Sequence, residues 1–269
     1  MGNFGTAELE AAERDACADF WAAAPAGLRA GFGVESRRLG DAALLMAPGL
    51  DGSLVFNRFI GWGIGGASRE ADVDAAIAAF ETAGVRTWAI QIAPGLGDVA
   101  TLAAARGLLP HPRAWVRFAR GPEPRAPAST ALVVREAGVP EAEVFGETQV
   151  RAFGEPEALA PWVAALVGRV GWRCFLAWDG GAPVATGALH VRGGLGWLGF
   201  GGTLREARGR GGQGALLAAR IAAGRAEGCR GFVTETGLPL AGEDAPSFRN
   251  IGRAGFRAAY ERPNLVRAP

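Results

Sequence analysis

The residues best suited to chemistry lie in one basic, glycine-rich segment, residues 203–217, which reads Thr-Leu-Arg-Glu-Ala-Arg-Gly-Arg-Gly-Gly-Gln-Gly-Ala-Leu-Leu. A strand-like Gly-Trp-Leu-Gly-Phe run precedes it, and an Ala/Leu-rich helical pattern follows. Glycines let backbone N–H groups come close to an anion, and a helix start adds free N–H groups and partial positive charge. Arg208 and Arg210 add guanidinium groups with a forked geometry suited to phosphate. The segment therefore predicts a phosphate-bearing ligand.

A dinucleotide is one alternative ligand, because residues 209–214 also match the GxGxxG pattern and Glu235 follows at about the distance of the ribose-binding acid. Two features disfavour this interpretation. Polar residues 203–207 separate the strand from the glycines, and the loop comes too late in the chain for the rest of a doubly wound sheet. Residues 61–66 match the same pattern in a chain with 42 glycines, so the match has little weight.

The order of motifs in the C-terminal half resembles the GNAT N-acetyltransferase family instead. Arg208-Gly-Arg-Gly211 followed by Ala215-Leu-Leu is similar to the acetyl-CoA loop of that family. A helix from about 213 to 227, a strand over 231–236, and a last helix that ends in Gly255-Phe256 follow in the family's order. The resemblance covers roughly residues 132–267.

The resemblance implies a set of acetyl-CoA-binding residues. Within it, Gly202, Thr203 and Leu204 would offer backbone groups to the pantetheine and thioester, and Asn250 on the last helix would hydrogen-bond the cofactor. The full implied set is Gly202, Thr203, Leu204, Arg208, Gly209, Arg210, Gly211, Gly212, Gln213, Gly214, Ala215 and Asn250. Gln213 departs from the family, which has Gly or Ala at this place in the phosphate turn.

Acetyl transfer to an amine needs a group that takes the amine's proton. Glu235 is the first candidate base because it lies on the strand after the loop, with a salt bridge as the structural alternative, and Glu147 is the second. Many members of the family have a tyrosine acid where this chain has Ile251. Tyr260, the single tyrosine, and Ser247 on the last helix are therefore the candidates for an acid, although an ordinary strand tyrosine is the more common finding.

The two halves of the chain show a similar order of elements, which predicts a tandem repeat. We expect a degenerate GNAT-like domain over residues 1–120, a Pro-rich linker over 121–129, and a GNAT acetyltransferase domain over 130–269. The first copy has no arginine in its loop at 61–66, and its next helix opens with Glu70, Asp72 and Asp74 after Ser68, a natural N-cap. Carboxylates there would repel a pyrophosphate, so we expect no cofactor in this copy.

Composition limits the remaining function classes. The 28 basic residues are all arginine and the net charge is +1, which gives no broad nucleic-acid-binding surface. The three cysteines are scattered, without the spacing of a metal site or a disulfide framework. The sequence shows neither a basic-then-apolar leader nor an apolar run that could span a bilayer. We expect a cytoplasmic protein without a metal or a membrane or nucleic-acid partner.

These inferences lead to one predicted fold and function. The fold class is α/β, with two GNAT-like domains that each have a mixed, mostly antiparallel sheet flanked by helices. The predicted function is transfer of an acetyl group from acetyl-CoA to a small-molecule amine. The amine attacks the thioester directly in a ternary complex. The alternative is a module that binds and senses acyl-CoA without turnover, which the missing tyrosine and the decayed first copy favour.

Overall fold

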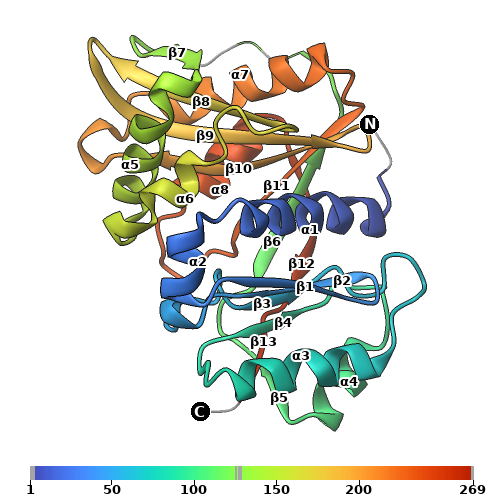
Figure 1. Ribbon diagram of the computed structural model, residues 1–269. Coiled ribbons are helices and arrows are strands. Elements are labelled where there is room, and N and C mark those ends of the chain that lie inside the picture. Colours follow the sequence, from blue (N-terminus) through green and yellow to red (C-terminus); the bar gives the residue numbers. More distant parts are fainter. Residues whose placement is uncertain (1–3, 125, 127–128, 268–269) are drawn as a thin grey trace. The chain divides into compact units, whose positions relative to one another are not determined.

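The computed structural model describes residues 4–124, 126 and 129–267, which form two compact units (Figure 1). Of the described residues, the N-terminal unit contains 4–117, 236–244 and 258–267, and the C-terminal unit contains 118–124, 126, 129–235 and 245–257. Within the described residues, no helix combines the length and the apolar character needed to cross a bilayer.

The N-terminal unit has a mixed sheet with helix α1 on one face and helices α3 and α4 on the other (Figure 1). Strands β1, β2 and β3 pair antiparallel, and β3 pairs parallel with β4 through the crossover helix α3. Its elements are α1 Thr6–Ala22, α2 Ala26–Phe32, β1 Glu35–Leu39, β2 Ala42–Met46, η1 Pro48–Leu50, β3 Arg58–Ile60, α3 Glu70–Thr82, β4 Ala89–Gln91, α4 Val99–Ala105, β5 Leu108–Pro110 and β13 Leu265–Arg267.

The C-terminal unit repeats this plan with longer strands. Strands β7 to β10 pair antiparallel in chain order, and β10 pairs parallel with β11 through α7. Its elements are β7 Val133–Glu136, η2 Val139–Glu141, α5 Ala142–Phe153, η3 Glu157–Leu159, α6 Ala160–Ala164, β8 Trp172–Asp179, β9 Ala182–Arg192, β10 Leu195–Thr203, η4 Arg205–Ala207, α7 Gly212–Ala226, β11 Gly231–Gly237 and α8 Pro246–Arg253.

Helices α5 and α7 cover opposite faces of this second sheet. Gln149 of α5 hydrogen-bonds Thr186 of β9. Arg220 of α7 lies against Gly187, the next residue of the same strand. Because successive strand residues point to opposite faces, the two helices are on different sides.

Each sheet takes in the last strand of the other half of the chain. In the described residues, the first sheet has the order β1-β2-β3-β4-β13-β5 and the second the order β12-β6-β11-β10-β9-β8-β7. Strand β6 (Trp115–Arg120) lies between β11 and β12 (Arg257–Arg262), just as β13 lies between β4 and β5. The two halves therefore exchange equivalent strands.

This exchange explains why the compact units differ from the expected domains at 1–120 and 130–269. Residues 258–267 group with the N-terminal unit because β13 pairs with β4 and β5, and residues 236–244 group with it too. Of the expected linker at 121–129, positions 125, 127 and 128 lie outside the described residues. Helix α2 ends just before β1, at Gly33, which has the left-handed conformation at φ 65°.

A buried cluster of charged side chains joins α1 to the strands β3, β6 and β12. Glu10 and Glu13 of α1 are 1 % and 0 % exposed. Arg262 NH1 lies 2.7 Å from Glu10 Oε2 and 2.6 Å from Glu13 Oε2. Arg58 NH1 donates to Glu13 Oε1 at 3.1 Å, and Arg117 donates to both glutamates. We call these five residues the buried ionic cluster.

Removing the charge of Glu13 should destabilise the N-terminal unit strongly. We expect Glu13→Gln to lower the free energy of unfolding by about 3–5 kcal/mol, because it leaves buried guanidinium groups without their carboxylate. Glu81→Gln is the matched control, since Glu81 pairs with Arg267 while both side chains are about half exposed, 50 % and 47 %. Glu81→Gln should change the free energy of unfolding by no more than about 0.5 kcal/mol. Urea unfolding measures both, and equal losses would contradict a special role for the cluster.

Candidate functional site

The glycine loop of the C-terminal unit ends in an open helix start. Gly209 and Gly211 have left-handed φ values of 78° and 81°, and Gly211 is the N-cap of α7. The first turn of α7 has no acidic residue and no side-chain cap, so its N–H groups are directed at the loop. A Cβ on Gly209 would meet no atom within 4 Å. The loop thus offers backbone donors and space to an anion.

One of the two loop arginines is already bound to a carboxylate. Arg210 NH1 and NH2 donate to Asp179 Oδ2 and Oδ1 at 2.6 and 2.8 Å. These hydrogen bonds lower the pKa of Asp179, which lies at the end of β8. Arg208 Nε donates to the Thr203 carbonyl at 3.3 Å and remains exposed. A phosphate on this loop would have to share Arg210 with Asp179, a competition that the sequence did not predict.

Strands β10 and β11 separate beside the loop. Their registered pairing ends at Leu198 and Thr234, although β10 continues to Thr203 and β11 to Gly237. The register of β10 against β9 shifts between Gly199 and Gly202. Phe200, in this bulge, has a φ of 54° and is the one non-glycine residue with positive φ among those described. Bulges and strained backbone of this kind often lie at functional sites.

The residues expected to contact the pantetheine lie at this separation. Gly202 and Thr203 are in register with Thr186 and Ala185 of β9. The Leu204 N–H donates to the Val184 carbonyl at 2.9 Å, so this group is engaged within the sheet and is not free for a thioester, unlike the expectation. Gly202 has a packing reason to be glycine, since a Cβ there would lie 2.7 Å from the Phe153 ring.

Glu235, the expected base, is the first residue of β11 beyond its registered pairing with β10. It is half-buried, and Thr234 before it donates to the Leu198 carbonyl at 2.8 Å. The structure therefore places this carboxylate at the point where the two strands part.

Helix α8 reaches the loop through Asn250. Asn250 Nδ2 donates to Gln213 Oε1 at 2.7 Å, so the expected cofactor amide already binds the first turn of α7. Gln213, the departure from the family pattern, thus links α7 to α8. Ser247 precedes Asn250 by three residues on the same helix and is half-buried. Ile251, at the place of the family's tyrosine, is 4 % exposed.

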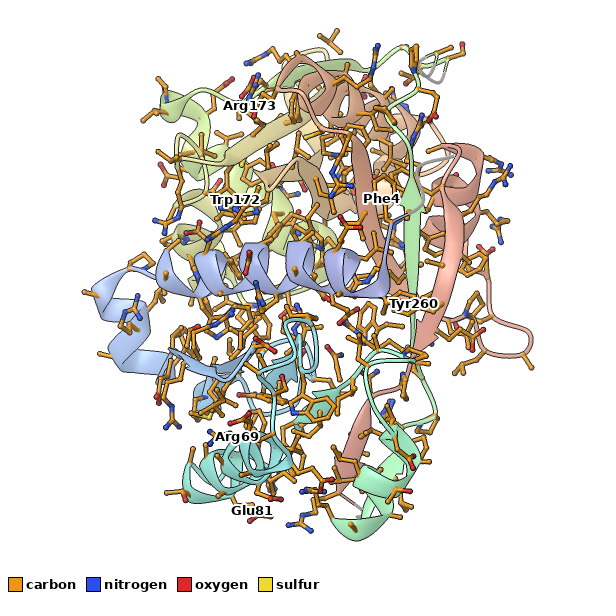
Figure 2. All side chains as sticks on the ribbon, turned by 90° about the vertical axis from the view of Figure 1, so that its right-hand side faces the viewer. Phe4, Arg69, Glu81, Trp172, Arg173 and Tyr260 are labelled. Carbon is orange, nitrogen blue, oxygen red and sulfur yellow. The ribbon has the colours of Figure 1, made fainter. Side chains whose placement is uncertain are left out.

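Tyr260 is hydrogen-bonded to the buried ionic cluster of the N-terminal unit. Its hydroxyl donates to Glu10 Oε1 at 2.6 Å, beside α1 (Figure 2). Burial raises the pKa of Tyr260 far above its usual value, and the charge of Glu10 and the hydrogen bond to it act in the same direction. These contacts favour a structural role over that of an acid.

A pocket of about 780 Å³ lies along α5 and α6 of the C-terminal unit. Glu147, the second candidate base, lines it together with Glu143, Glu157 and Arg151. The described residues contain no group of three or more His, Cys, Asp or Glu side chains placed to hold a metal ion. Carboxylates are in excess in this pocket, which favours a cationic ligand.

The glycine loop of the N-terminal unit is filled by the chain's own carboxylate. Asp41 Oδ2 accepts hydrogen bonds from the N–H groups of Gly65 and Ala67, each at 3.0 Å, and from the Ser68 hydroxyl at 3.2 Å. Ser68 Oγ also accepts from the Gly63 N–H at 2.7 Å, and Arg69 rather than Ser68 is the N-cap of α3. Asp41 therefore occupies donors that an anion on this loop would need.

The two aspartates, Asp41 and Asp179, occupy corresponding positions in their units. Each lies at the turn between the two strands that precede the strand leading into the loop, β1–β2 in one unit and β8–β9 in the other. Asp179 binds the loop through Arg210, whereas Asp41 binds the loop amides directly. The same hairpin thus leaves one loop open and closes the other.

Known structures share this architecture, although no protein-family model and no curated protein matches the sequence. A GCN5-related N-acetyltransferase from Sphaerobacter thermophilus superposes with a TM-score of 0.59 at 20 % identity, over 96 % of this chain and 90 % of that one. One from Kribbella flavida gives a TM-score of 0.56 at 17 % identity, over 94 % and 96 %. The chain has the GNAT fold.

A tandem GNAT protein from the clavulanic acid biosynthesis pathway also matches, with a TM-score of 0.53 at 20 % identity over 85 % of this chain and 78 % of that one. Two GNAT-like units, each with a mixed, mostly antiparallel sheet, confirm the predicted fold class. In the GNAT fold of this chain, the open loop belongs to the C-terminal unit and the closed loop to the N-terminal unit.

Closure of the first loop should depend on the ionisation of Asp41. Burial alone would raise the pKa of Asp41, but the hydrogen bonds from Ala67, Gly65 and Ser68 and the charge of Arg14 outweigh it and lower the pKa below 3.8. Because the folded-state pKa is lowered, the stabilisation is complete above the unfolded value near 3.9 and is lost as pH falls through the folded value.

We expect the Gly65 and Ala67 amide resonances in a ¹⁵N-resolved NMR titration to shift with a midpoint below 3.8. In Asp41→Asn, this transition should disappear, while the Thr101 amide, which is capped by Asp98, should still respond to acid. A midpoint above 3.8, or a transition that survives in Asp41→Asn, would contradict the role of Asp41.

Proposed function

We propose that the chain is an acetyl-CoA-dependent N-acetyltransferase that acts on a small-molecule amine in a ternary complex. The observation that carries the proposal is the open glycine loop at the start of α7, next to the point where β10 and β11 separate. The loop suits a pyrophosphate, and the gap between two parting strands suits an extended chain that needs backbone hydrogen bonds. The GNAT fold of the chain is consistent with a pyrophosphate at the loop and with an extended ligand between the two strands.

The proposed reaction needs little from the side chains. The neutral amine nitrogen attacks the thioester carbonyl, its proton passes to Glu235 directly or through water, the C–S bond breaks, and the thiolate leaves with the electron pair. A thiolate is a much weaker base than an alkoxide, so its departure depends less on an acid than that of an alkoxide does. The apolar, buried Ile251 in place of the family's tyrosine is therefore compatible with turnover.

The acceptor side of the proposal rests on the pocket along α5 and α6. Its three glutamates, Glu143, Glu147 and Glu157, attract ammonium groups and repel anionic acceptors. A second candidate function, binding of acyl-CoA without turnover, is favoured by the same buried Ile251. The release of CoA from acetyl-CoA in the presence of polyamines, aminoglycosides or amino acids separates the two.

The two glycine loops allow a matched test of cofactor binding. Gly209 and Gly66 both have left-handed φ values, 78° and 76°, and a Cβ on either would meet no atom within 4 Å. Valine at either position should therefore cost similar stability, about 1–2 kcal/mol for left-handed backbone. Calorimetric titration with CoA should show at least about a tenfold weaker affinity for Gly209→Val, since the added methyl groups oppose backbone approach to phosphate.

In Gly66→Val, the CoA affinity should stay at the wild-type value, because Asp41 already closes that loop. Equal weakening by both variants would show that the N-terminal loop also binds the cofactor. Gly211 is a poorer probe, because a Cβ there would lie 2.9 Å from the Ser129 carbonyl oxygen and disturb the fold directly.

Glu235→Gln tests the proton path. We expect it to retain CoA affinity and to lower the rate of acetyl transfer by about 100-fold, the usual scale for a general base. The loss should shrink as pH rises, because more of the free amine is then neutral without help from the protein. Thiol-release rates across pH measure this effect, and full activity of Glu235→Gln at neutral pH would direct attention to Glu147.

A further inference from the structure

Arg220 is a buried cation of α7 that takes no direct part in the proposed reaction. It is 2 % exposed, and it takes part in none of the ion pairs found among the described residues. Its guanidinium group donates instead to three carbonyls, from Nε to Leu216 at 3.0 Å and from NH1 to Gly199 at 3.1 Å and Ala188 at 3.3 Å. Burial lowers the pKa of Arg220 to about 10, so it is still charged at neutral pH.

Two glycines make room for this guanidinium group. A Cβ on Gly187 of β9 would lie 2.7 Å from Arg220 Cζ, and a Cβ on Gly201 of β10 would lie 3.6 Å from NH2. Arg220 therefore lies directly against the backbone of both strands at the bulge. Burying a charge without a carboxylate is costly. One of the three carbonyls that Arg220 binds, that of Gly199, lies where β10 changes register, and another, that of Ala188, belongs to the residue of β9 paired with Gly199.

The bulge is held from both faces of the sheet. Arg220 binds the Gly199 carbonyl from the α7 face, and Thr186 Oγ1 donates to the Phe200 carbonyl at 3.1 Å from the strand β9. In a trans peptide the C=O and N–H groups point in opposite directions. Because the Phe200 carbonyl is directed at the Thr186 side chain, the Gly201 N–H of the same peptide is directed away from that side chain. Beyond Leu198 and Thr234, β11 no longer pairs with β10.

We propose that Arg220 is a positioning residue that holds the bulge of β10 so that the Gly201 N–H faces the gap between β10 and β11. This inference rests on the proposed function for its catalytic use. When the amine attacks, the thioester carbonyl oxygen gains negative charge, and a fixed N–H there stabilises it. The buried guanidinium group, bound to the Gly199 carbonyl one peptide earlier, keeps this donor fixed and adds positive potential.

Three variants test the proposal. Arg220→Met removes the charge and the donors, Arg220→Lys keeps the charge and one donor group, and Arg225→Met is the control, an exposed arginine of the same helix. We expect Arg220→Met to lower kcat by about 10- to 100-fold with KM for acetyl-CoA within about threefold, somewhat less than loss of a whole oxyanion donor. Arg220→Lys should recover part of the rate, and Arg225→Met should match the wild type.

Hydrogen exchange gives a readout that does not depend on activity. In Arg220→Lys and Arg220→Met, exchange should accelerate in peptides that cover residues 196–204, with little change over residues 172–179 of β8. Wild-type kcat together with wild-type exchange over 196–204 in Arg220→Met would overturn the proposal. If Arg220→Met does not fold, Arg220→Lys decides: a lower kcat at unchanged KM supports the proposal, and an unchanged kcat contradicts it.

Failure of the proposed function would look different. The wild-type protein would then release no CoA from acetyl-CoA with any amine, whereas local exchange over residues 196–204 would still respond to Arg220→Lys if Arg220 holds the bulge. Uniformly faster exchange throughout the C-terminal unit would show that Arg220 only stabilises the fold, and would overturn its positioning role.

Discussion

The buried ionic cluster is the interaction on which the N-terminal unit depends most. Glu10 and Glu13 come from one turn of α1, and their arginine partners come from β3, β6 and β12. Charges removed from water require near-complete pairing, so each partner fixes the place of the others. The cluster ties the start of the chain to residues about 250 positions later, Tyr260 and Arg262, and thereby anchors the segment that leads into β13.

This anchoring makes the strand exchange possible. Strand β13 is only three residues long, yet it pairs with β4 on one side and β5 on the other. So short a strand has little stability of its own, and the ionic cluster a few residues earlier supplies the attachment. Tyr260 is a member of this attachment. As the single tyrosine of the chain it was a candidate acid, but its contacts are those of a half-buried structural tyrosine, the alternative that the sequence also offered.

In the C-terminal unit, the corresponding constraint is the shape of β10. The strand pairs with β9 on both sides of its bulge, from Leu195 to Gly199 and again at Gly202 and Thr203, but with β11 only as far as Leu198. The bulge at Phe200 accommodates the two demands, and Arg220 and Thr186 bind its carbonyls. The N-terminal unit has the same architecture, but its corresponding strand is short and its loop is closed. Its strand β3 has three residues, and Asp41 replaces an external anion on the loop that follows.

The sequence by itself determined the local elements and the open loop. Glycines at 209 and 211 and the absence of acids at the start of α7 act through neighbours in the chain, so the local sequence pattern reveals them. The similar order of elements in the two halves also predicted the repeat. Helix α2 was missed because its seven residues carry little periodic signal.

Only the tertiary structure decided which distant groups meet. The contacts of Asp41 with Gly65, Asp179 with Arg210 and Tyr260 with Glu10 join positions 24, 31 and 250 residues apart. The sequence offered one sign of the role of Arg220, a single arginine on the apolar face of a helix, four residues after buried Leu216. The exchange of β6 and β13 had no such sign, because strands of the same pattern can pair in either sheet. Side-chain pattern specifies which face of a strand is buried, whereas the choice of neighbouring strand depends on hydrogen bonds and packing formed only when the whole chain has folded.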